Sequence, residues 1–286
     1  MAVTRRTALA SFAALVSPLA IPQRAASQAP ADWRLARETE WPEFAAKFEQ
    51  LGAKGTLVLL DGLRGGKLIA NAGRASEPLP PGLTFAIPTT LIALHLGDAK
   101  DIDEEMFKWS GQRVVADGKQ LYSSACDADI PLRVAFANGC VPVYDELARR
   151  IGADAYNDWL TKFDYGDPLP ETARVEKFRG DDNLRISADQ QTKFLRRLIT
   201  KTLPVTPRAS ALTEEAMFIE RIDKTAIHGA SDDRLAVPPA KGWWVGFAQR
   251  GEDVVLVALH LDRPNNDRAG LRYDLVKDAL RAIQML

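Results

Sequence analysis

The side chains best suited to chemistry in this sequence are two cysteines and three histidines. The histidines are His95, His228 and His260, and they stand too far apart in the chain to show the short spacing of a metal-ligand cluster. Cys140 could act as a nucleophile if a base lay beside it in the fold. Cys126 and Cys140 could instead form a disulfide, or remain two buried thiols. The sequence leaves these alternatives open.

Other catalytic patterns are missing or have an ordinary explanation. The chain contains no phosphate-binding P-loop, no G-x-G-x-x-G nucleotide fingerprint and no G-x-S-x-G nucleophile elbow. Four acids cluster in DIDEEMFKW (101–109), and a solvated loop or helix start explains them better than a pair of catalytic carboxylates. We therefore expect neither a bound metal nor a cofactor.

Strands are expected at both ends of the chain and helices between them. Hairpins are predicted by GTLVLLD (55–61) with KLIANAG (67–73) and by GWWVGFAQ (242–249) with VVLVALHLD (254–262), and a further strand by TAIHGAS (225–231). Helices are predicted within 30–50 and over 86–97, 187–203, 211–222 and 268–285, and residues 130–163 are largely helical, with LRVAFAN followed by VPVYDELARRIGADAYNDWLTKF. This order predicts an α+β fold. Both chain ends build one antiparallel sheet, flanked by helices, and a central helical block lies between them in the sequence.

The composition is that of an ordinary globular chain with an N-terminal extension. The 286 residues are 46% hydrophobic and 26% charged, and the net charge of -1 gives no indication of a nucleic-acid partner. Residues 1–29 combine Arg5-Arg6, a short apolar run and small residues, which predicts a cleaved twin-arginine export signal. An uncleaved anchor is the alternative. Residues 30–286 then form a single periplasmic domain without a membrane span.

Ordered sequence blocks resemble one enzyme family. The blocks are TFAIPTTLIALHLG (84–97), DEEMFKWSG (103–111), VPVYDELARRIG (141–152), KFDYGDP (162–168), LRIS (184–187), LP (203–204) and GWWVGF (242–247). In this order they resemble the class D β-lactamases, the oxacillinase group of penicillin-recognising serine enzymes. The resemblance extends from about Gly55 to the C-terminus and implies a β-lactamase/transpeptidase-like fold.

The residues at the family's catalytic positions are unusual. The family carries Ser-x-x-Lys, in which the serine attacks the β-lactam and the carbamylated lysine acts as general base. Here the same window is Leu83-Thr84-Phe85-Ala86. The serine of the family's Ser-x-Val motif corresponds to Gly139. The Lys-Thr/Ser-Gly motif corresponds to Ile227-His228-Gly229 or, in a less favoured register, to Lys224-Thr225-Ala226.

Three further positions bear on ligand binding. Arg179 stands where the family has a tryptophan that shields the carbamylated lysine, and Tyr165-Gly166-Asp167 nearly keeps the family's Tyr-Gly-Asn. Arg272 matches the arginine that pairs with the substrate carboxylate, which an arginine can bind through two hydrogen bonds. A surface ion pair on the last helix is the alternative for Arg272. The resemblance thus implies Arg272, Gly229 and Tyr165 as remaining substrate-binding residues.

Two functions are compatible with this pattern. The first is an exported, catalytically inactive homologue, because Leu83 and Ala86 supply neither nucleophile nor base. It would bind a small carboxylate, a cell-wall peptide or a protein partner. The second is an active hydrolase of penicillin-type compounds that uses other residues, such as a Cys140–His228 pair, because the resemblance places the Ser-x-Val and Lys-Thr/Ser-Gly positions on two walls of one cleft. A β-lactam sensor is less favoured, because such sensors need the acylated serine and a membrane helix.

Overall fold

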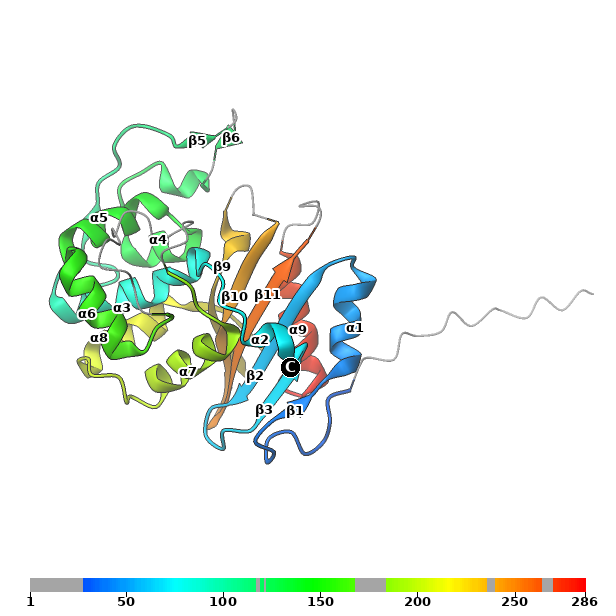
Figure 1. The fold of residues 1–286 in the computed structure, drawn as a ribbon. Coiled ribbons are helices and arrows are strands. Elements are labelled where there is room, and N and C mark those ends of the chain that lie inside the picture. Colours follow the sequence, from blue (N-terminus) through cyan, green and yellow to red (C-terminus); the bar gives the residue numbers. More distant parts are fainter. Residues whose placement is uncertain (1–27, 117–118, 121, 168–183, 236–239, 264–269) are drawn as a thin grey trace, which may run out of the picture.

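A seven-stranded sheet with helices on both faces forms the centre of the molecule (Figure 1). The computed structural model describes residues 28–116, 119–120, 122–167, 184–235, 240–263 and 270–286. In spatial order the strands are β1 (Thr39–Glu40), β3 (Lys67–Ala70), β2 (Lys54–Asp61), β11 (Asp253–Asp262), β10 (Lys241–Arg250), β9 (Thr225–Ser231) and β8 (Phe218–Ile222). β1 pairs with β3 in parallel, and the other neighbours are antiparallel.

The sheet joins the two ends of the chain, as the sequence predicts. β2 pairs with β11, from Lys54 opposite Asp262 to Asp61 opposite Val255. Both predicted hairpins are present as β2–β3 and β10–β11. Almost every residue of β2 and β11 is buried, because helices cover both faces of the sheet. This two-sided burial explains why the strands are nearly continuous apolar runs.

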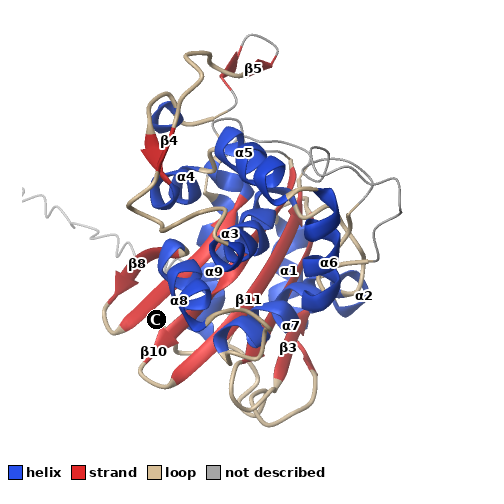
Figure 2. Cartoon of the chain, turned by 90° about the vertical axis from the view of Figure 1, so that its left-hand side faces the viewer, coloured by secondary structure: helices blue, strands red, loops and turns tan. Residues whose placement is uncertain are grey.

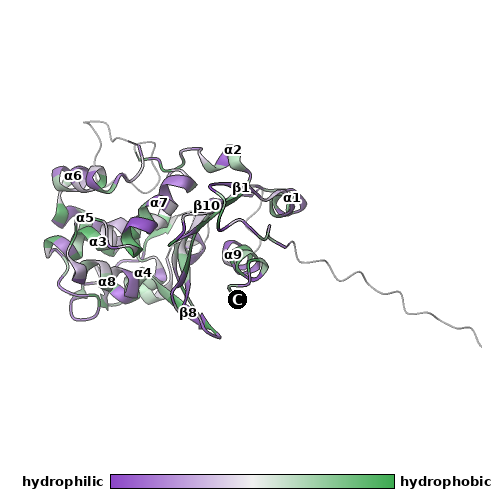
Figure 3. Ribbon diagram, turned by 90° about the horizontal axis from the view of Figure 1, so that it is seen from below, coloured by the Kyte–Doolittle hydropathy of each residue, from purple (hydrophilic) through white to green (hydrophobic). Residues whose placement is uncertain are grey.

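Helices on opposite faces of the sheet divide the core into two parts (Figures 1 and 3). On one face, α1 (Pro42–Gln50) and α9 (Leu271–Ala282) pack over an apolar cluster. This cluster contains Trp41, Trp244 of β10, and Val257 and Leu259 of β11. The two helices come from opposite ends of the chain, so this part of the core also joins the termini.

On the other face of the sheet lies the helical block, shown in Figure 2. It consists of α3 (Ala86–Leu96), α4 (Leu132–Asn138), α5 (Val141–Ile151), α6 (Ala153–Phe163), α7 (Ala188–Ile199) and α8 (Pro207–Ala216). The short helix α2 (Ala72–Ala75) follows β3 and leads the chain from the sheet towards this block. Of the two helical stretches predicted within 130–163, the first is α4, and the second is divided at Gly152 into α5 and α6.

Helix α3 lies in the middle of the helical block. Its residues Leu91, Ile92 and Ala93 are fully buried, and the helix is apolar on all sides, which is typical of a helix surrounded by protein. It continues directly from the 3₁₀ turn η1 (Gly82–Phe85) and ends at Gly97, which takes the left-handed conformation of a helix C-cap. The start of α3 is therefore held between the sheet and the surrounding helices.

One predicted helix is wrong in its second half. The sequence predicts a helix over 211–222, but α8 ends at Ala216 and Phe218–Ile222 forms the edge strand β8. Pairing with β9 decides the conformation there, because tertiary contacts override local helix propensity. Within the described residues, no helix is long and apolar enough to cross a membrane. The predicted export signal falls almost entirely in residues 1–27, outside the described part of the chain.

Candidate functional site

The position that the resemblance assigns to the nucleophile is filled by the Leu83 side chain. Leu83 lies in η1 and is only 9% exposed. It packs against Gly139, the left-handed C-cap of α4, where an added Cβ would lie 2.8 Å from Leu83 Cδ1. The structure thus brings Leu83 and Gly139 together, as the resemblance implies. Their contact leaves no room for even a methyl group between them.

A buried carboxylate, Asp232, lies beside Leu83. Its Oδ1 accepts a hydrogen bond from the backbone N–H of Leu83, and its Oδ2 accepts one from the backbone N–H of Trp243, both at 2.7 Å. Gly82 and Gly242 make room for the carboxylate, since a Cβ at either position would lie within 2.6 Å of one of its oxygens. Burial raises the pKa of Asp232 to about 6, against the opposing effect of these two hydrogen bonds.

Arg234 joins the two walls of the predicted cleft. Asp232 and Arg234 belong to the 3₁₀ turn η4 (Asp232–Arg234) that follows β9. The guanidinium donates to the backbone oxygen of Phe136 in α4 and to that of Gly229 in β9, both at 2.7 Å. Burial lowers the pKa of Arg234 to about 10, so it remains charged at neutral pH. Sequence reasoning missed Asp232 and Arg234, although DDR (232–234) directly follows the predicted strand TAIHGAS (225–231).

Arg272, the expected carboxylate-binding residue, already binds a carboxylate of the protein itself. Its side chain is fully buried and forms an ion pair with Asp233. Its backbone N–H also donates to Asp233 Oδ2 at 3.1 Å, and its Nη2 donates to the Ala240 oxygen at 3.3 Å. The last helix therefore carries an ion pair at Arg272, but this pair is buried and does not lie on the surface.

The strand residues Ile227 and His228 do not form a catalytic wall. Ile227 is buried in the cluster on the α9 side of the sheet, so its expected place in the cleft is wrong. Successive side chains of a strand point to opposite faces of the sheet, so His228 lies on the other face. There its ring stacks on the ring of Phe247, with 4.4 Å between the ring centroids. Its Nδ1 lies 2.8 Å from the Glu214 carbonyl oxygen, which can only accept, so Nδ1 carries the proton. Burial lowers the pKa of His228.

The speculative nucleophile Cys140 is part of a disulfide. Its sulfur is bonded to Cys126 at 2.06 Å, and no cysteine of the chain is free. This settles the question of pairing that the sequence left open. A disulfide sulfur has no thiolate to attack a substrate, so the expectation of a Cys140–His228 pair is wrong for this structure.

Tyr165 supports η1 through a chain of hydrogen bonds. Its hydroxyl donates to Gln191 Oε1 at 3.4 Å, and Gln191 Nε2 donates to Thr84 Oγ1 at 3.0 Å. Burial raises the pKa of Tyr165, which is therefore neutral. Tyr165 thus contributes to the position of the turn that carries Leu83.

Three further positions named from the resemblance have structural roles or cannot be placed. Gly229 is required by packing, because a Cβ there would lie 2.8 Å from the Trp244 ring. Ala86 begins α3 and is partly buried against the core. Arg179 lies outside the described residues.

Comparisons with known proteins agree with this architecture. Residues 55–281 match the family described as the penicillin binding protein transpeptidase domain. β-Lactamase OXA-48 of Klebsiella pneumoniae is 34% identical over 246 residues, which cover 85% of this chain and 89% of that protein. β-Lactamase OXA-2 of Salmonella typhimurium is 31% identical over 253 residues, which cover 87% of this chain and 86% of that protein.

Solved structures give the same result. The class D β-lactamase YbXI from Nostoc has a TM-score of 0.76 and 27% identity, and the match covers 85% of this chain and 99% of that chain. The class D β-lactamase FUS-1 (OXA-85) from Fusobacterium nucleatum subsp. polymorphum has a TM-score of 0.76 and 28% identity, and the match covers 87% of this chain and 100% of that chain. With the shared element order and the match over most of its length, this chain belongs to the class D β-lactamase family.

Proposed function

We propose that this protein is a catalytically inactive member of the class D family and that its role is to bind a ligand. The observations that carry the proposal are the side chain at position 83 and the hydrogen bond of its backbone N–H. The Leu83 side chain offers no nucleophilic atom and packs on Gly139. Its backbone N–H, the kind of donor that stabilises an oxyanion in serine acyl transfer, is bonded to Asp232. Both the attacking group and an oxyanion donor are thus lacking at this position.

The alternative, an active hydrolase with replacement residues, receives less support. Its best candidate, Cys140, is bonded to Cys126. His228 directs its protonated Nδ1 to the Glu214 carbonyl oxygen. The ligand classes compatible with the sequence are a small carboxylate, a cell-wall peptide and a protein. Because Arg272 is buried against Asp233, a carboxylate ligand would need another site.

Acylation and turnover test the proposal directly. The purified protein is incubated with a fluorescent penicillin, denatured and examined for a covalent adduct, with β-lactamase OXA-48 as the positive control. Nitrocefin hydrolysis is measured in parallel at high protein concentration. We expect neither adduct nor turnover above the uncatalysed rate. A covalent adduct, or turnover proportional to protein concentration, would refute the proposed inactivity.

We also propose export to the periplasm. Arg5-Arg6 and the following apolar run support a twin-arginine signal, and the Cys126–Cys140 disulfide suits an oxidising compartment. Fractionation of cells that express the full chain should place the mature protein in the periplasm, and Arg5→Lys with Arg6→Lys should retain it in the cytoplasm. If wild type and the double variant were distributed in the same way between periplasm and cytoplasm, export by this signal would be contradicted.

A further inference from the structure

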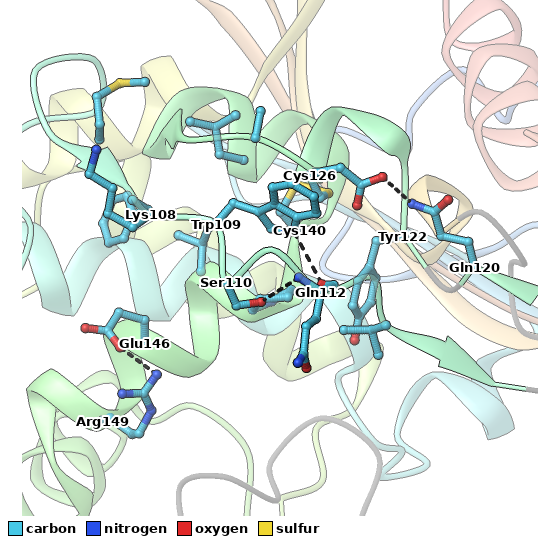
Figure 4. A pocket seen from close by; sticks show the side chains of 18 of the residues that line it. Lys108, Trp109, Ser110, Gln112, Gln120, Tyr122, Cys126, Cys140, Glu146 and Arg149 are labelled. Carbon is cyan, nitrogen blue, oxygen red and sulfur yellow. Dashed lines mark hydrogen bonds and ion pairs between the residues drawn. A yellow bond between two sulfur atoms is a disulfide. The ribbon is translucent and has the colours of Figure 1, made fainter.

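A separate cavity lies between helix α5 and a long excursion of the chain (Figure 4). We call the described residues of 106–130 the α5-facing segment. β4 (Met106–Phe107) and β7 (Ile130–Pro131) pair at its base, and β5 (Val115–Ala116) and β6 (Lys119–Gln120) pair at its tip. The cavity has a volume of about 380 Å³, within the usual range for small-molecule sites.

A disulfide joins the two walls of this cavity. Cys126 belongs to the α5-facing segment, and Cys140 directly precedes α5; both line the cavity. Within the segment, Lys108 Nζ pairs with Asp129 at 2.6 Å. Walls that are joined covalently need less ordering when a ligand binds, which favours affinity.

The mouth of the cavity is apolar and partly aromatic. Met106, Trp109 and Val114 line it, although they are 46%, 39% and 40% exposed. Trp109 Nε1 donates to the Gln112 oxygen at 3.3 Å, which orients the indole ring. Single exposed apolar residues are ordinary, but a group of them around a cavity indicates a binding site. Trp109 and Tyr122 favour a ligand with a planar aromatic body.

The carboxylates of the cavity already have partners. Asp127 Oδ2 accepts from Gln120 Nε2 at 3.0 Å and pairs with Arg113 Nε at 2.9 Å. Glu146 pairs with Arg150 Nε at 3.1 Å, and this arginine lowers the pKa of Glu146. Both acids are therefore poor attachment points for a cationic ligand.

Exposed cations supply hydrogen-bond donors for a ligand. Lys108 and Arg149 line the cavity with side chains that are 81% and 61% exposed. Arg149 pairs with Glu146 through Nη2, and a guanidinium carries five N–H groups in all. Figure 4 shows Lys108 and Arg149 on one side of the cavity and Tyr122 on the other, with Trp109 between them. This arrangement suits an anionic group at one end of an aromatic ligand.

We propose that this cavity binds a small aromatic carboxylate, with its ring against Trp109 and its carboxylate on Arg149. An arginine binds a carboxylate through two parallel hydrogen bonds, and such bonds are stronger than those to a neutral group. The proposal rests on the binding role proposed above and places it outside the closed cleft around Leu83. It requires no acyl transfer.

Paired probes test the proposal in the oxidised, full mature chain. Calorimetric titration compares 2-naphthoate with the uncharged 2-naphthamide, which has the same ring. We expect 2-naphthoate to bind with one-to-one stoichiometry and about 10-fold or more tighter than the amide. Arg149→Gln should weaken binding of 2-naphthoate much more than binding of 2-naphthamide, and so remove most of this difference. Trp109→Ala should weaken both probes.

Matched variants control for general surface effects. Arg281 pairs with Asp278 by the same three-residue spacing and is 56% exposed, so Arg281→Gln should leave both affinities unchanged. Phe218 is 44% exposed at the sheet edge, so Phe218→Ala is the control for Trp109→Ala. Absence of binding at millimolar probe, or equal binding by wild type and Arg149→Gln, would overturn the proposal. No β-lactam is used, so these outcomes are independent of the acylation assay.

Discussion

The contact between Leu83 and Gly139 should appear as a coupling energy in a double-mutant cycle. Gly139→Ala adds a Cβ at 2.8 Å from Leu83 Cδ1, well inside the roughly 3.5 Å of a normal carbon contact. It also places alanine at φ +61°, in the left-handed region. We expect about 1–2 kcal/mol of backbone strain and about 1–3 kcal/mol of overpacking. Leu83→Ala alone should cost about 2–5 kcal/mol.

The double variant should be more stable than the sum of the two losses predicts. Leu83→Ala removes the atom that the new methyl group meets most closely, so most of the overpacking is relieved, while a 3.3 Å contact with Arg234 Cβ and the backbone strain remain. The expected coupling is about 1–3 kcal/mol, measured by urea unfolding of the wild type, both single variants and the double variant. Gly97 is the control, because it is also a left-handed helix C-cap but has open space around it.

The control separates backbone strain from contact. Gly97→Ala should cost about 1–2 kcal/mol and should be additive with Leu83→Ala. If the stability losses of Gly139→Ala and Leu83→Ala are also additive within about 0.5 kcal/mol, the Leu83 side chain does not fill the space at Gly139. The reasoning on the closed cleft then fails.

Three further predictions concern buried groups. Because burial raises the pKa of Asp232 from 3.8 to about 6, the folded state holds its proton more tightly; wild type should lose about 3 kcal/mol of stability as the pH rises from about 4 to above 6. Urea unfolding of Asp232→Asn should not show this loss of stability. If the stability of wild type and of Asp232→Asn changes with pH in parallel, the raised pKa of Asp232 is contradicted. Replacing Cys126 and Cys140 by serine should cost about 3 kcal/mol, and a reductant should lower the Tm of wild type but not of the variant. Arg272→Ala should cost about 3–5 kcal/mol in urea unfolding, because the buried Asp233 loses its partner, and Asp233→Asn in the same chain should recover part of it.

Local patterns in the sequence predict the elements that frame the site. Gly97 ends α3 as a glycine C-cap should, and Ser187 caps α7 with a full capping box to Gln190. The strands of both hairpins follow from apolar runs and their turns. These features depend on neighbours a few residues away, which the sequence displays directly.

The contents of the cleft depend on distances that the sequence does not display. Which face Ile227 takes depends on strand register, and a shift of one residue reverses it. The pairing of Cys126 with Cys140 depends on their separation in space. The role of Arg272 depends on Asp233, a residue 39 positions away. Family resemblance locates these residues near one another but does not determine which of them become partners.

The pairing of β2 with β11 has a consequence for the folding kinetics of the chain. Asp61 lies opposite Val255, so the centre of the sheet forms only after almost the whole polypeptide is available. Within the helical block, neighbours such as α4 with α5 and α5 with α6 are close in the sequence and can gain structure earlier. Closing such a long loop before the central strands meet is entropically costly, and folds with many contacts of this kind fold slowly. Refolding should therefore be limited by docking of the C-terminal hairpin, and a chain truncated before β10 should leave β2 as an unprotected, aggregation-prone edge.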